Sequence, residues 1–403
     1  MINNSSLRIS YASAVHDDLE KQRVIKVLDE HRTIIGKETG EFESRVAKEF
    51  GYRYGVMVNS GSSANLVALE LLNLPEGSEV ITPLLTFSTT VAPIVQKKLI
   101  PVFIDVEEGK YNINIDLIEK AITGKTKLLM IPLLIGNVPN LKRLAEIAIR
   151  HNLNFIIDSC DTFAATYNDK PSGAFGDITT TSFYGSHIIT AGGGGGMLLV
   201  NRKEWEDRAK VLRGWGRSSS IFGDTEDITK RFKAKIGGLQ YDAKFIFDEI
   251  GYNFLPLEMG AAFGNAQLDK LATFKKTREE NFQTLYGFFK KYEDYFILPV
   301  QDPKVKTQWL AFPLTIKKTV PFSRLTLATY LEKNNIQTRP VFTGNILKQP
   351  GFRNIPHKTF ENEFPATNTV MEQSILVGCH HGLTQKHISK MQEVFTSFLQ
   401  KYI

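Results

Sequence analysis

The chain has 403 residues, 42% of them hydrophobic and 23% charged, a composition typical of a globular protein large enough for two domains. Its net charge of +6 comes with scattered lysine pairs, which argues against a nucleic-acid partner, although a basic surplus suits phosphorylated small ligands. Two cysteines are too few for a disulfide framework. Met1–Ser10 contains no signal-like stretch, and no run of about eighteen apolar residues is present, so we expect a cytoplasmic protein without a membrane partner.

The first expected elements are helical and the next alternate. From Leu19 to Lys48 the apolar residues recur with helical spacing, interrupted near Gly36. Short apolar strands then alternate with helical patterns such as residues 141–148, which favours an α/β fold with a mostly parallel sheet. In such a sheet, ligands gather at the carboxyl ends of the strands. The expected strands are Tyr54–Val58, Glu79–Thr82, Pro101–Val106, Leu128–Leu134 and Asn154–Ile157.

The first polar motif at a strand end is Asn59–Asn65, which contains Gly61, Ser62 and Ser63. It lies between an expected strand and an apolar helical run. Small hydroxylated residues there can simply cap the free backbone N–H groups of the helix. The same N–H groups, together with the helix dipole, can also bind an anion such as phosphate.

Two further motifs follow later strands. Phe87, in Thr86–Thr90, is either a core residue or a flat apolar face for a ring ligand. Asp158 closes the apolar run Phe155–Ile157 and is followed by Asp161. A carboxylate at such a position is either exposed or needs a cationic partner, because burial of an unpaired charge is costly.

The segment Ser182–Ala191 runs on through Gly192–Gly196 into the apolar residues 197–200. This pattern predicts strand, turn and strand, and the glycines permit close approach of the backbone to a ligand or to another segment. Taken alone, the glycines could equally form a flexible hairpin, and His187 could be a core residue.

The whole segment resembles the active site of the fold-type I, pyridoxal-phosphate-dependent sugar aminotransferases, in which Ser-Phe-x-x-x-Lys leads into a Gly-Gly turn. His187 stands where that family has the lysine that binds pyridoxal phosphate (PLP) covalently. The same replacement marks the CDP-4-keto-6-deoxyglucose 3-dehydrases and the GDP-4-keto-6-deoxymannose 3-dehydratases. An imidazole cannot form the covalent bond, but it can transfer protons near neutral pH.

The resemblance implies an aspartate-aminotransferase-like fold with a large PLP-binding domain, residues 1–255, and a smaller α+β domain, residues 256–403. It also implies residue roles. The residues implied to hold the cofactor phosphate are Gly61, Ser62, Ser63 and Ser182, together with Asn253 across a homodimer. At the cofactor ring, Phe87 is implied to stack on the face, Asp158 to pair with the ring nitrogen and Asp161 to lie near the ring hydroxyl. His187 is implied to be catalytic, and Arg339 to bind the sugar nucleotide.

One departure concerns the CDP-sugar dehydrases, which carry an iron–sulfur cluster on four cysteines at fixed spacing. Starting from Cys160, that spacing falls on Ser218, Ser220 and Ile228, so three of four ligands are missing. Serine and isoleucine do not replace cluster thiolates. We therefore expect no iron–sulfur cluster.

The resemblance implies an enzyme that removes the 3-hydroxyl of an NDP-4-keto-6-deoxyhexose with PLP and pyridoxamine phosphate (PMP), in the biosynthesis of deoxysugars such as the 3,6-dideoxysugars of lipopolysaccharide O-antigens. L-glutamate is the expected amino donor and His187 the expected acid and base. Two alternatives remain: a cluster-free dehydrase that needs a partner reductase, and a non-catalytic sugar-nucleotide-binding scaffold. The sequence leaves open whether the nucleotide is CDP, GDP or dTDP.

Overall fold

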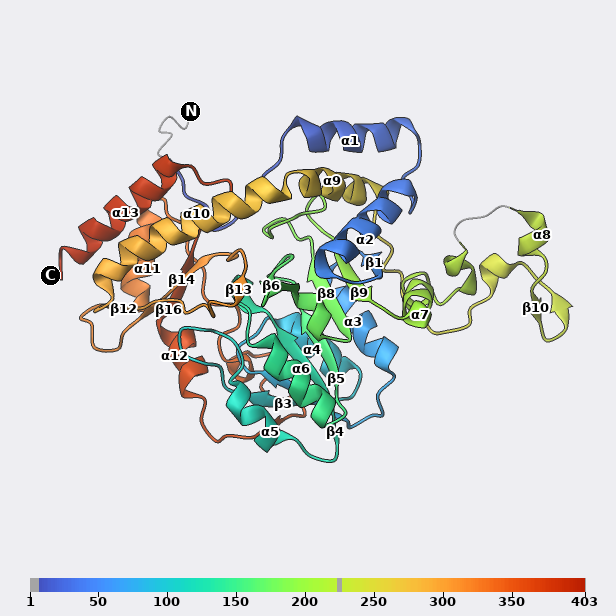
Figure 1. Cartoon of the computed structure of the whole chain (residues 1–403), viewed down its shortest axis with the longest axis horizontal. Helices are drawn as coiled ribbons and strands as arrows, with labels where there is room; N and C mark the ends of the chain where they lie inside the picture. Colours follow the sequence, from blue (N-terminus) through green and yellow to red (C-terminus); the bar gives the residue numbers. More distant parts are fainter. Residues whose placement is uncertain (1–6, 223–226, 403) are drawn as a thin grey trace.

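A computed structural model describes residues 7–222 and 227–402 of the chain (Figure 1). The expectation about Met1–Ser10 therefore lies partly outside the described residues. Within the described part of the chain, no helix is both long enough and apolar enough to cross a membrane.

The central element is a mostly parallel sheet of eight strands, as the sequence predicts. β9 alone runs against its neighbours β1 and β8, and the other pairs are parallel. In spatial order the strands are β1 (Tyr54–Val58), β9 (Gly196–Val200), β8 (Ile178–Ser182), β5 (Asn154–Asp158), β4 (Thr126–Pro132), β2 (Glu79–Pro83), β3 (Ile100–Ile104) and β15 (Lys358–Thr359).

Two strands are shorter at their ends than expected. β3 stops at Ile104, and the next residue, Asp105, accepts hydrogen bonds from the backbone N–H groups of Ala366 and Thr367. β4 stops at Pro132 because the chain turns through Leu134–Gly136, where Ile135 has a φ of 58°. Both ends are thus bent by tertiary contacts or turns that an apolar pattern does not reveal.

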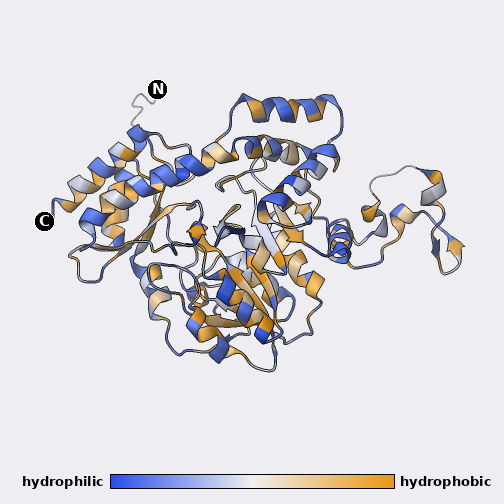
Figure 2. Ribbon diagram, viewed as in Figure 1, coloured by the Kyte–Doolittle hydropathy of each residue, from blue (hydrophilic) through white to orange (hydrophobic). Residues whose placement is uncertain are grey.

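Helices cover both faces of the sheet, and their apolar sides form two separate cores with it. Several of the strands between them are coloured as hydrophobic in Figure 2. α6 packs through Leu141 and Leu144 on one face, and α3 packs through Val67 and Leu69 on the other. These helices and their neighbours are α3 (Gly61–Leu72), α4 (Ser88–Gln96), α5 (Ile118–Ala121), α6 (Leu141–Arg150) and α7 (Lys203–Arg213).

The helical stretch before the sheet is broken near Gly36, as expected, into α1 (Asp18–Asp29) and α2 (Lys37–Phe50). Glu258, the first residue of α9 (Glu258–Asp269), accepts hydrogen bonds from the N–H groups of Gly36, Glu38 and Thr39 at 2.8, 2.6 and 3.1 Å. A carboxylate satisfies free N–H groups at a helix start and complements the dipole there. The break is therefore held by a residue more than two hundred positions later.

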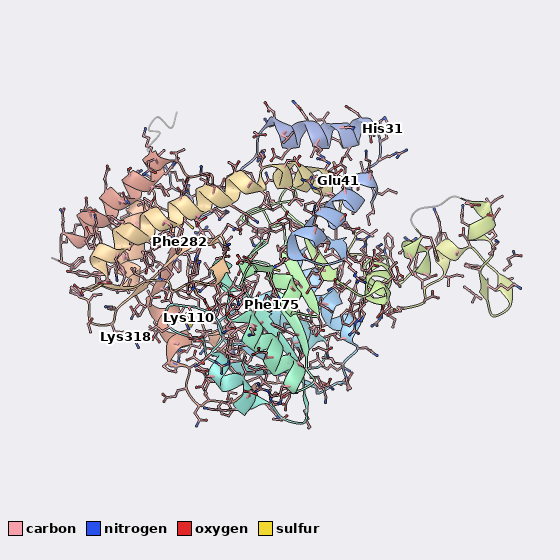
Figure 3. All side chains as sticks on the ribbon, in the orientation of Figure 1. His31, Glu41, Lys110, Phe175, Phe282 and Lys318 are labelled. Atoms are coloured by element: carbon pink, nitrogen blue, oxygen red, sulfur yellow. The ribbon has the colours of Figure 1, made fainter. Side chains whose placement is uncertain are left out.

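The C-terminal part has its own sheet, in the order β12 (Phe296–Ile297), β14 (Phe312–Ile316) and β16 (Ser374–Val377). Phe282, a residue of α10 that is labelled in Figure 3, stacks on Trp309 with ring centroids 4.9 Å apart. The helices of this part are α10 (Leu271–Phe289), α11 (Arg324–Lys333), α12 (Pro365–Gln373) and α13 (Gln385–Leu399).

Elements from residues 256–403 pack against or pair with elements from the earlier part of the chain. α9 packs against α1 and α2, and β15 pairs with β3 at the edge of the large sheet. β13 (Val305–Lys306) pairs with β6 (Thr166–Tyr167), which also pairs with β7 (Lys170–Pro171). The division at residues 255 and 256 remains a prediction.

Residues 217–222 and 227–250, here called the arm, project from the body of the molecule (Figure 1). The arm contains α8 (Ile228–Arg231) and the short hairpin of β10 (Lys235–Ile236) and β11 (Leu239–Gln240). Its large apolar side chains face outward, and Ile250 is 98% exposed. The exposed set is Phe222, Ile228, Phe232, Ile236, Leu239, Tyr241, Phe245, Phe247 and Ile250.

Candidate active site

A cavity of about 560 Å³ opens at the carboxyl ends of the parallel strands, where the sequence predicts a ligand. Asp158 ends β5, Ser182 ends β8, and Phe87 follows β2. Residues from the N-terminal segment and from the C-terminal part complete the wall. The lining residues used below are Tyr11, Ser60, Gly61, Ser62, Asn65, Phe87, Thr90, Asp158, Cys160, Asp161, Ser182, Tyr184, Ser186, His187, Leu310, Arg339, Pro340 and Phe342.

The N-terminus of α3 faces this cavity through Gly61 and Ser62. A Cβ atom on Gly61 would lie 2.7 Å from the Cβ of Ser182, so only glycine fits this close approach. Ser63 has a different place. Its N–H donates to Ser60 Oγ at 3.1 Å, its hydroxyl donates to Asn59 Oδ1 at 2.7 Å, and the lining residues do not include it.

Asp158 is 5% exposed and accepts several hydrogen bonds. Its Oδ2 accepts from Asn65 Nδ2 at 2.9 Å and from Thr90 Oγ1 at 2.7 Å, and its Oδ1 accepts from the N–H of Cys160 at 3.2 Å. Thr180 Oγ1 donates to Asn65 Oδ1 and thereby fixes the orientation of the amide. The carboxylate is thus held in place in a buried site that suits a cationic ligand group.

His187 has one defined tautomer. Its Nδ1 lies 3.2 Å from the carbonyl oxygen of Ser182, which can only accept, so Nδ1 carries the proton. Nε2 is then the basic nitrogen, and it lies 4.0 Å from Asp161 Oδ1. Burial lowers the pKa of His187 to about 4, and the nearby charge of Arg278 acts in the same direction. At neutral pH the imidazole therefore offers an unprotonated Nε2.

Asp161 is largely shielded from solvent, with 13% of its side chain exposed. Burial, and then the charge of Asp158, raise its pKa to about 7. Its Oδ2 lies 3.5 Å from the N–H of Ile135. Around neutral pH the cavity thus holds two groups, Asp161 and His187, whose pKa values are displaced in opposite directions, a pattern common at catalytic sites.

The remaining predicted residues lie at the rim or outside it. The ring of Phe87 is 49% exposed and lines the cavity. Arg339 lines the cavity opposite the large sheet, and its Nη1 donates to the carbonyl oxygen of Thr338 at 2.8 Å. Asn253 is exposed and bridges to Gly214 at the base of the arm, away from the cavity of its own chain. These residues are therefore not all brought together within one chain.

Several lining residues were not predicted. Asn65 follows Gly61 by one helical turn, and that spacing places both on one face of α3, so this residue could have been found. Thr90 likewise lies one turn after Phe87. Tyr11 and Phe342 reach the cavity from distant parts of the chain, and no local pattern indicates them.

The residues present fit PLP. Backbone N–H groups at the α3 N-terminus suit its phosphate, the Phe87 face suits its ring, and the buried Asp158 carboxylate suits a protonated ring nitrogen. The described residues that line the cavity include no lysine. The site can therefore hold this cofactor by non-covalent contacts while His187 occupies the lysine's place.

The four positions at which the cluster cysteines would stand are divided between the cavity and the arm. Cys160 lines the cavity, whereas Ser218 and Ser220 lie in a short 3-10 turn and Ile228 begins α8. No group of three or more His, Cys, Asp or Glu residues suited to a metal ion occurs among residues 7–222 and 227–402. The expectation that the protein has no iron–sulfur cluster still rests on the missing cysteines.

Comparisons with known proteins agree with this geometry. A family model described as the DegT/DnrJ/EryC1/StrS aminotransferase family matches residues 15–396. The dTDP-4-dehydro-2,6-dideoxy-D-glucose 3-dehydratase of Saccharopolyspora spinosa is 35% identical over 98% of this chain and 87% of that protein. The lipopolysaccharide biosynthesis protein RfbH of Salmonella typhimurium is 37% identical over 89% of this chain and 85% of that protein.

Solved structures show the same fold. The Escherichia coli GDP-4-keto-6-deoxy-D-mannose 3-dehydratase with bound hydrated PLP has a TM-score of 0.86 and 29% identity, over 96% of this chain and 98% of that chain. A GDP-4-keto-6-deoxymannose 3-dehydratase with a trapped PLP-glutamate geminal diamine also has a TM-score of 0.86 and 29% identity, over 96% and 99% of the two chains. The fold predicted from the resemblance is confirmed.

Proposed function

This chain belongs to the DegT/DnrJ/EryC1/StrS aminotransferase family, and we propose that within it the chain is a PLP- and PMP-dependent dehydratase that removes the 3-hydroxyl of an NDP-4-keto-6-deoxyhexose. One observation carries this proposal. His187 stands in the cavity where the aminotransferases have their lysine, with a free Nε2 at neutral pH. The chain's own residues therefore favour proton transfer over covalent attachment of the cofactor.

When bound, the cofactor supplies an amino group and an electron-withdrawing ring. The residues that would hold it are Asp158 at the ring nitrogen, Phe87 against the ring face, Asp161 near the ring hydroxyl and the α3 N-terminus with Ser182 at the phosphate. Asn65 and Thr90 keep the Asp158 carboxylate oriented. We propose the same phosphate role for Ser63 through its place in the α3 start, and for Asn253 across a subunit interface.

His187 would act as both base and acid. Its unprotonated Nε2 can accept a proton, and the imidazolium so formed can give that proton to the departing 3-hydroxyl, which leaves as water. Ser182 keeps Nδ1 protonated throughout, so a single nitrogen performs both transfers. A positioned group of this kind contributes about 10²- to 10⁴-fold to a rate.

The substrate class follows from the relatives and from Arg339. Relatives act on dTDP- and GDP-sugars, so we propose a nucleoside-diphosphate 4-keto-6-deoxyhexose without choosing the base. The guanidinium of Arg339 can bind a diphosphate through two hydrogen bonds at once. A role in deoxysugar biosynthesis for lipopolysaccharide is supported by the likeness to RfbH.

We also propose a cytoplasmic homodimer. The exposed apolar side chains of the arm form a surface larger than isolated exposed residues account for, and such patches mark protein interfaces. Asn253 lies three residues after the arm, is exposed and is not among the residues that line the cavity of its own chain, which fits a contribution to the site of a second subunit.

The test is turnover of a panel of CDP-, GDP- and dTDP-4-keto-6-deoxyhexoses with PLP and L-glutamate, followed by mass spectrometry. We expect a 3-deoxy-4-keto sugar, with one 2-oxoglutarate and one ammonia released per sugar. No reductase should be needed, because no cluster delivers electrons and each turnover consumes a fresh amino group.

Two outcomes would contradict this function. Turnover that ignores glutamate but requires an added reductase would favour the electron-accepting dehydrase. Binding of PLP and sugar nucleotide without turnover of any panel member would favour the non-catalytic scaffold.

A further inference from the structure

The turn Pro340–Gly344 of the C-terminal part is unusually constrained where it meets the cavity. Phe342 has a φ of 45°, a conformation that is an outlier for a bulky side chain. Its N–H donates to the carbonyl oxygen of Pro340 at 2.9 Å, which closes a tight turn. Backbone strain of this kind persists only where surrounding contacts hold it, and it is common at functional sites.

The contacts that hold this turn come from the end of β2 and from α12. Thr343 Oγ1 donates to the carbonyl oxygen of Thr86 at 2.6 Å, and Asn345 forms a β-bridge with Leu85. Gly344 has a φ of 61°, and a Cβ atom there would lie 2.5 Å from Met371 on α12. The turn is therefore attached to the two residues that immediately precede Phe87.

The same turn brings two aromatic rings together. The rings of Phe342 and Phe87 meet edge to face, with centroids 5.9 Å apart and an angle of 86° between their planes. Both side chains line the cavity. Phe87 is half-exposed, so the packing that restrains its ring is limited, and an edge-to-face partner is a substantial part of it.

We propose that Phe342 is a positioning residue that holds the ring of Phe87 at the angle needed to stack on the cofactor. This inference rests on the proposed function, because it takes Phe87 as the stacking face for PLP. The strained backbone at Phe342 is then the cost of placing its ring edge against Phe87. Phe342 acts through Phe87, so its effect on cofactor affinity should vanish when Phe87 is absent.

The experiment is a double-mutant cycle on PLP affinity, measured by fluorescence titration without any sugar. Phe342→Gly removes the ring and accepts a positive φ without strain, and Phe87→Ala removes the stacking face. We expect Phe342→Gly to raise the PLP Kd by about 2- to 12-fold, the range of an aromatic pair energy. Phe342 also packs against the core of the C-terminal part, so Tm should fall as well, and the dependence of the Kd change on Phe87 is the deciding readout. In the Phe87→Ala background the same change should leave the Kd unaltered.

Phe360→Ala, which truncates another exposed phenylalanine, is the matched control and should change neither quantity. Equal effects of Phe342→Gly with and without Phe87 would overturn the proposal, as would a Kd that does not change. A wild-type protein that binds PLP but dehydrates no sugar would refute the proposed function and still leave this coupling measurable.

Discussion

The cavity and the arm differ in where they place their polar and apolar groups. In the cavity, Asp158 is buried, His187 is largely shielded, and the polar atoms of both are oriented by named partners. In the arm, large apolar side chains such as Phe245 and Phe247 face outward. The cavity also holds the residues proposed to bind PLP, whereas the arm has Ser218, Ser220 and Ile228 at three of the four positions where a cluster would need cysteines. The fourth position, Cys160, lies in the cavity. The polar groups of the proposed proton transfer are thus retained while most of the ligands for electron delivery are missing.

The strongest test of the cavity is His187→Asn. The amide can keep a hydrogen bond to Ser182 but cannot accept and return a proton near neutral pH, so turnover should fall by about 10²- to 10⁴-fold. PLP affinity, measured by absorbance titration, should change little. His357→Asn alters an exposed histidine and is the control. Turnover that survives in His187→Asn would remove the acid–base assignment and with it the contrast between the two regions.

The corresponding test of the arm is the double substitution Phe245→Ser and Phe247→Ser. Each phenylalanine is more than half exposed in the single chain, so the changes should leave Tm of the monomer fold nearly unaltered. Burial of one such side chain at an interface contributes about 1.5–3 kcal/mol. We therefore expect the dissociation constant of the dimer, measured by analytical ultracentrifugation, to rise by at least about 10-fold. Ile149→Ser, which changes an 81% exposed side chain of α6, is the control. An unchanged dimer would show that the arm faces some other partner.

The free energy of unfolding should depend on pH through Asp161, which lies in the cavity and not in the arm. Burial and Asp158 raise the pKa of Asp161 from 3.8 to about 7, so the folded chain binds more protons than the unfolded chain between these values. The free energy of unfolding should therefore fall as pH rises from about 4 to about 7. Because asparagine does not ionise, Asp161→Asn should remove this fall in the free energy of unfolding.

In cofactor-free protein, urea unfolding should show Asp161→Asn gaining on the order of 1–4 kcal/mol over wild type between pH 5 and pH 8, at 1.36 kcal/mol per pKa unit. Asp116→Asn, which changes an exposed carboxylate, should show no such gain. Parallel pH profiles for wild type and Asp161→Asn would mean that Asp161 remains ionised in the fold.

The smallest expected effect is that of chelators on turnover, because we expect the protein to contain no bound iron. Protein purified without oxygen should contain no stoichiometric iron or sulfide, and chelators should leave turnover unchanged, because Ser218, Ser220 and Ile228 cannot bind iron as cysteines do. Iron analysis and the visible spectrum check this. Two iron atoms per chain with a cluster spectrum would show that the arm keeps a redox role.

Much of the fold was predictable because the sheet is built from local apolar patterns. Asp158 was found for the same reason, since it closes an apolar strand and parallel strands end at one edge. Ser182 was assigned only through the family resemblance, because its strand is rich in threonine and gives no apolar pattern. Ser63 shows the limit of this reasoning. Its neighbours Gly61 and Ser62 line the cavity, but its hydroxyl is used within the helix start by Asn59, and sequence spacing does not distinguish these two uses.

The residues that sequence reasoning missed reach the cavity through tertiary structure. Phe342 comes from a turn whose backbone conformation, φ 45°, is disfavoured for phenylalanine and is imposed by Thr86, Leu85 and Met371. Tyr11 arrives because the N-terminal segment joins the C-terminal part through the bridge between Ile9 and Ile336. Neither contact leaves a periodic or compositional signal.

The hydrogen bond between His187 Nδ1 and the Ser182 carbonyl also has a stereochemical consequence. It leaves Nε2 as the basic nitrogen on one wall of the cavity, so under the proposed role of His187 a proton would be taken up and returned at one atom, from one side of a bound sugar. The departing hydroxyl would then have to lie on the face of the sugar turned toward Nε2. A hexose epimeric at carbon 3 would present its hydroxyl to the opposite wall, and the enzyme should discriminate between the two by the handedness of a single carbon.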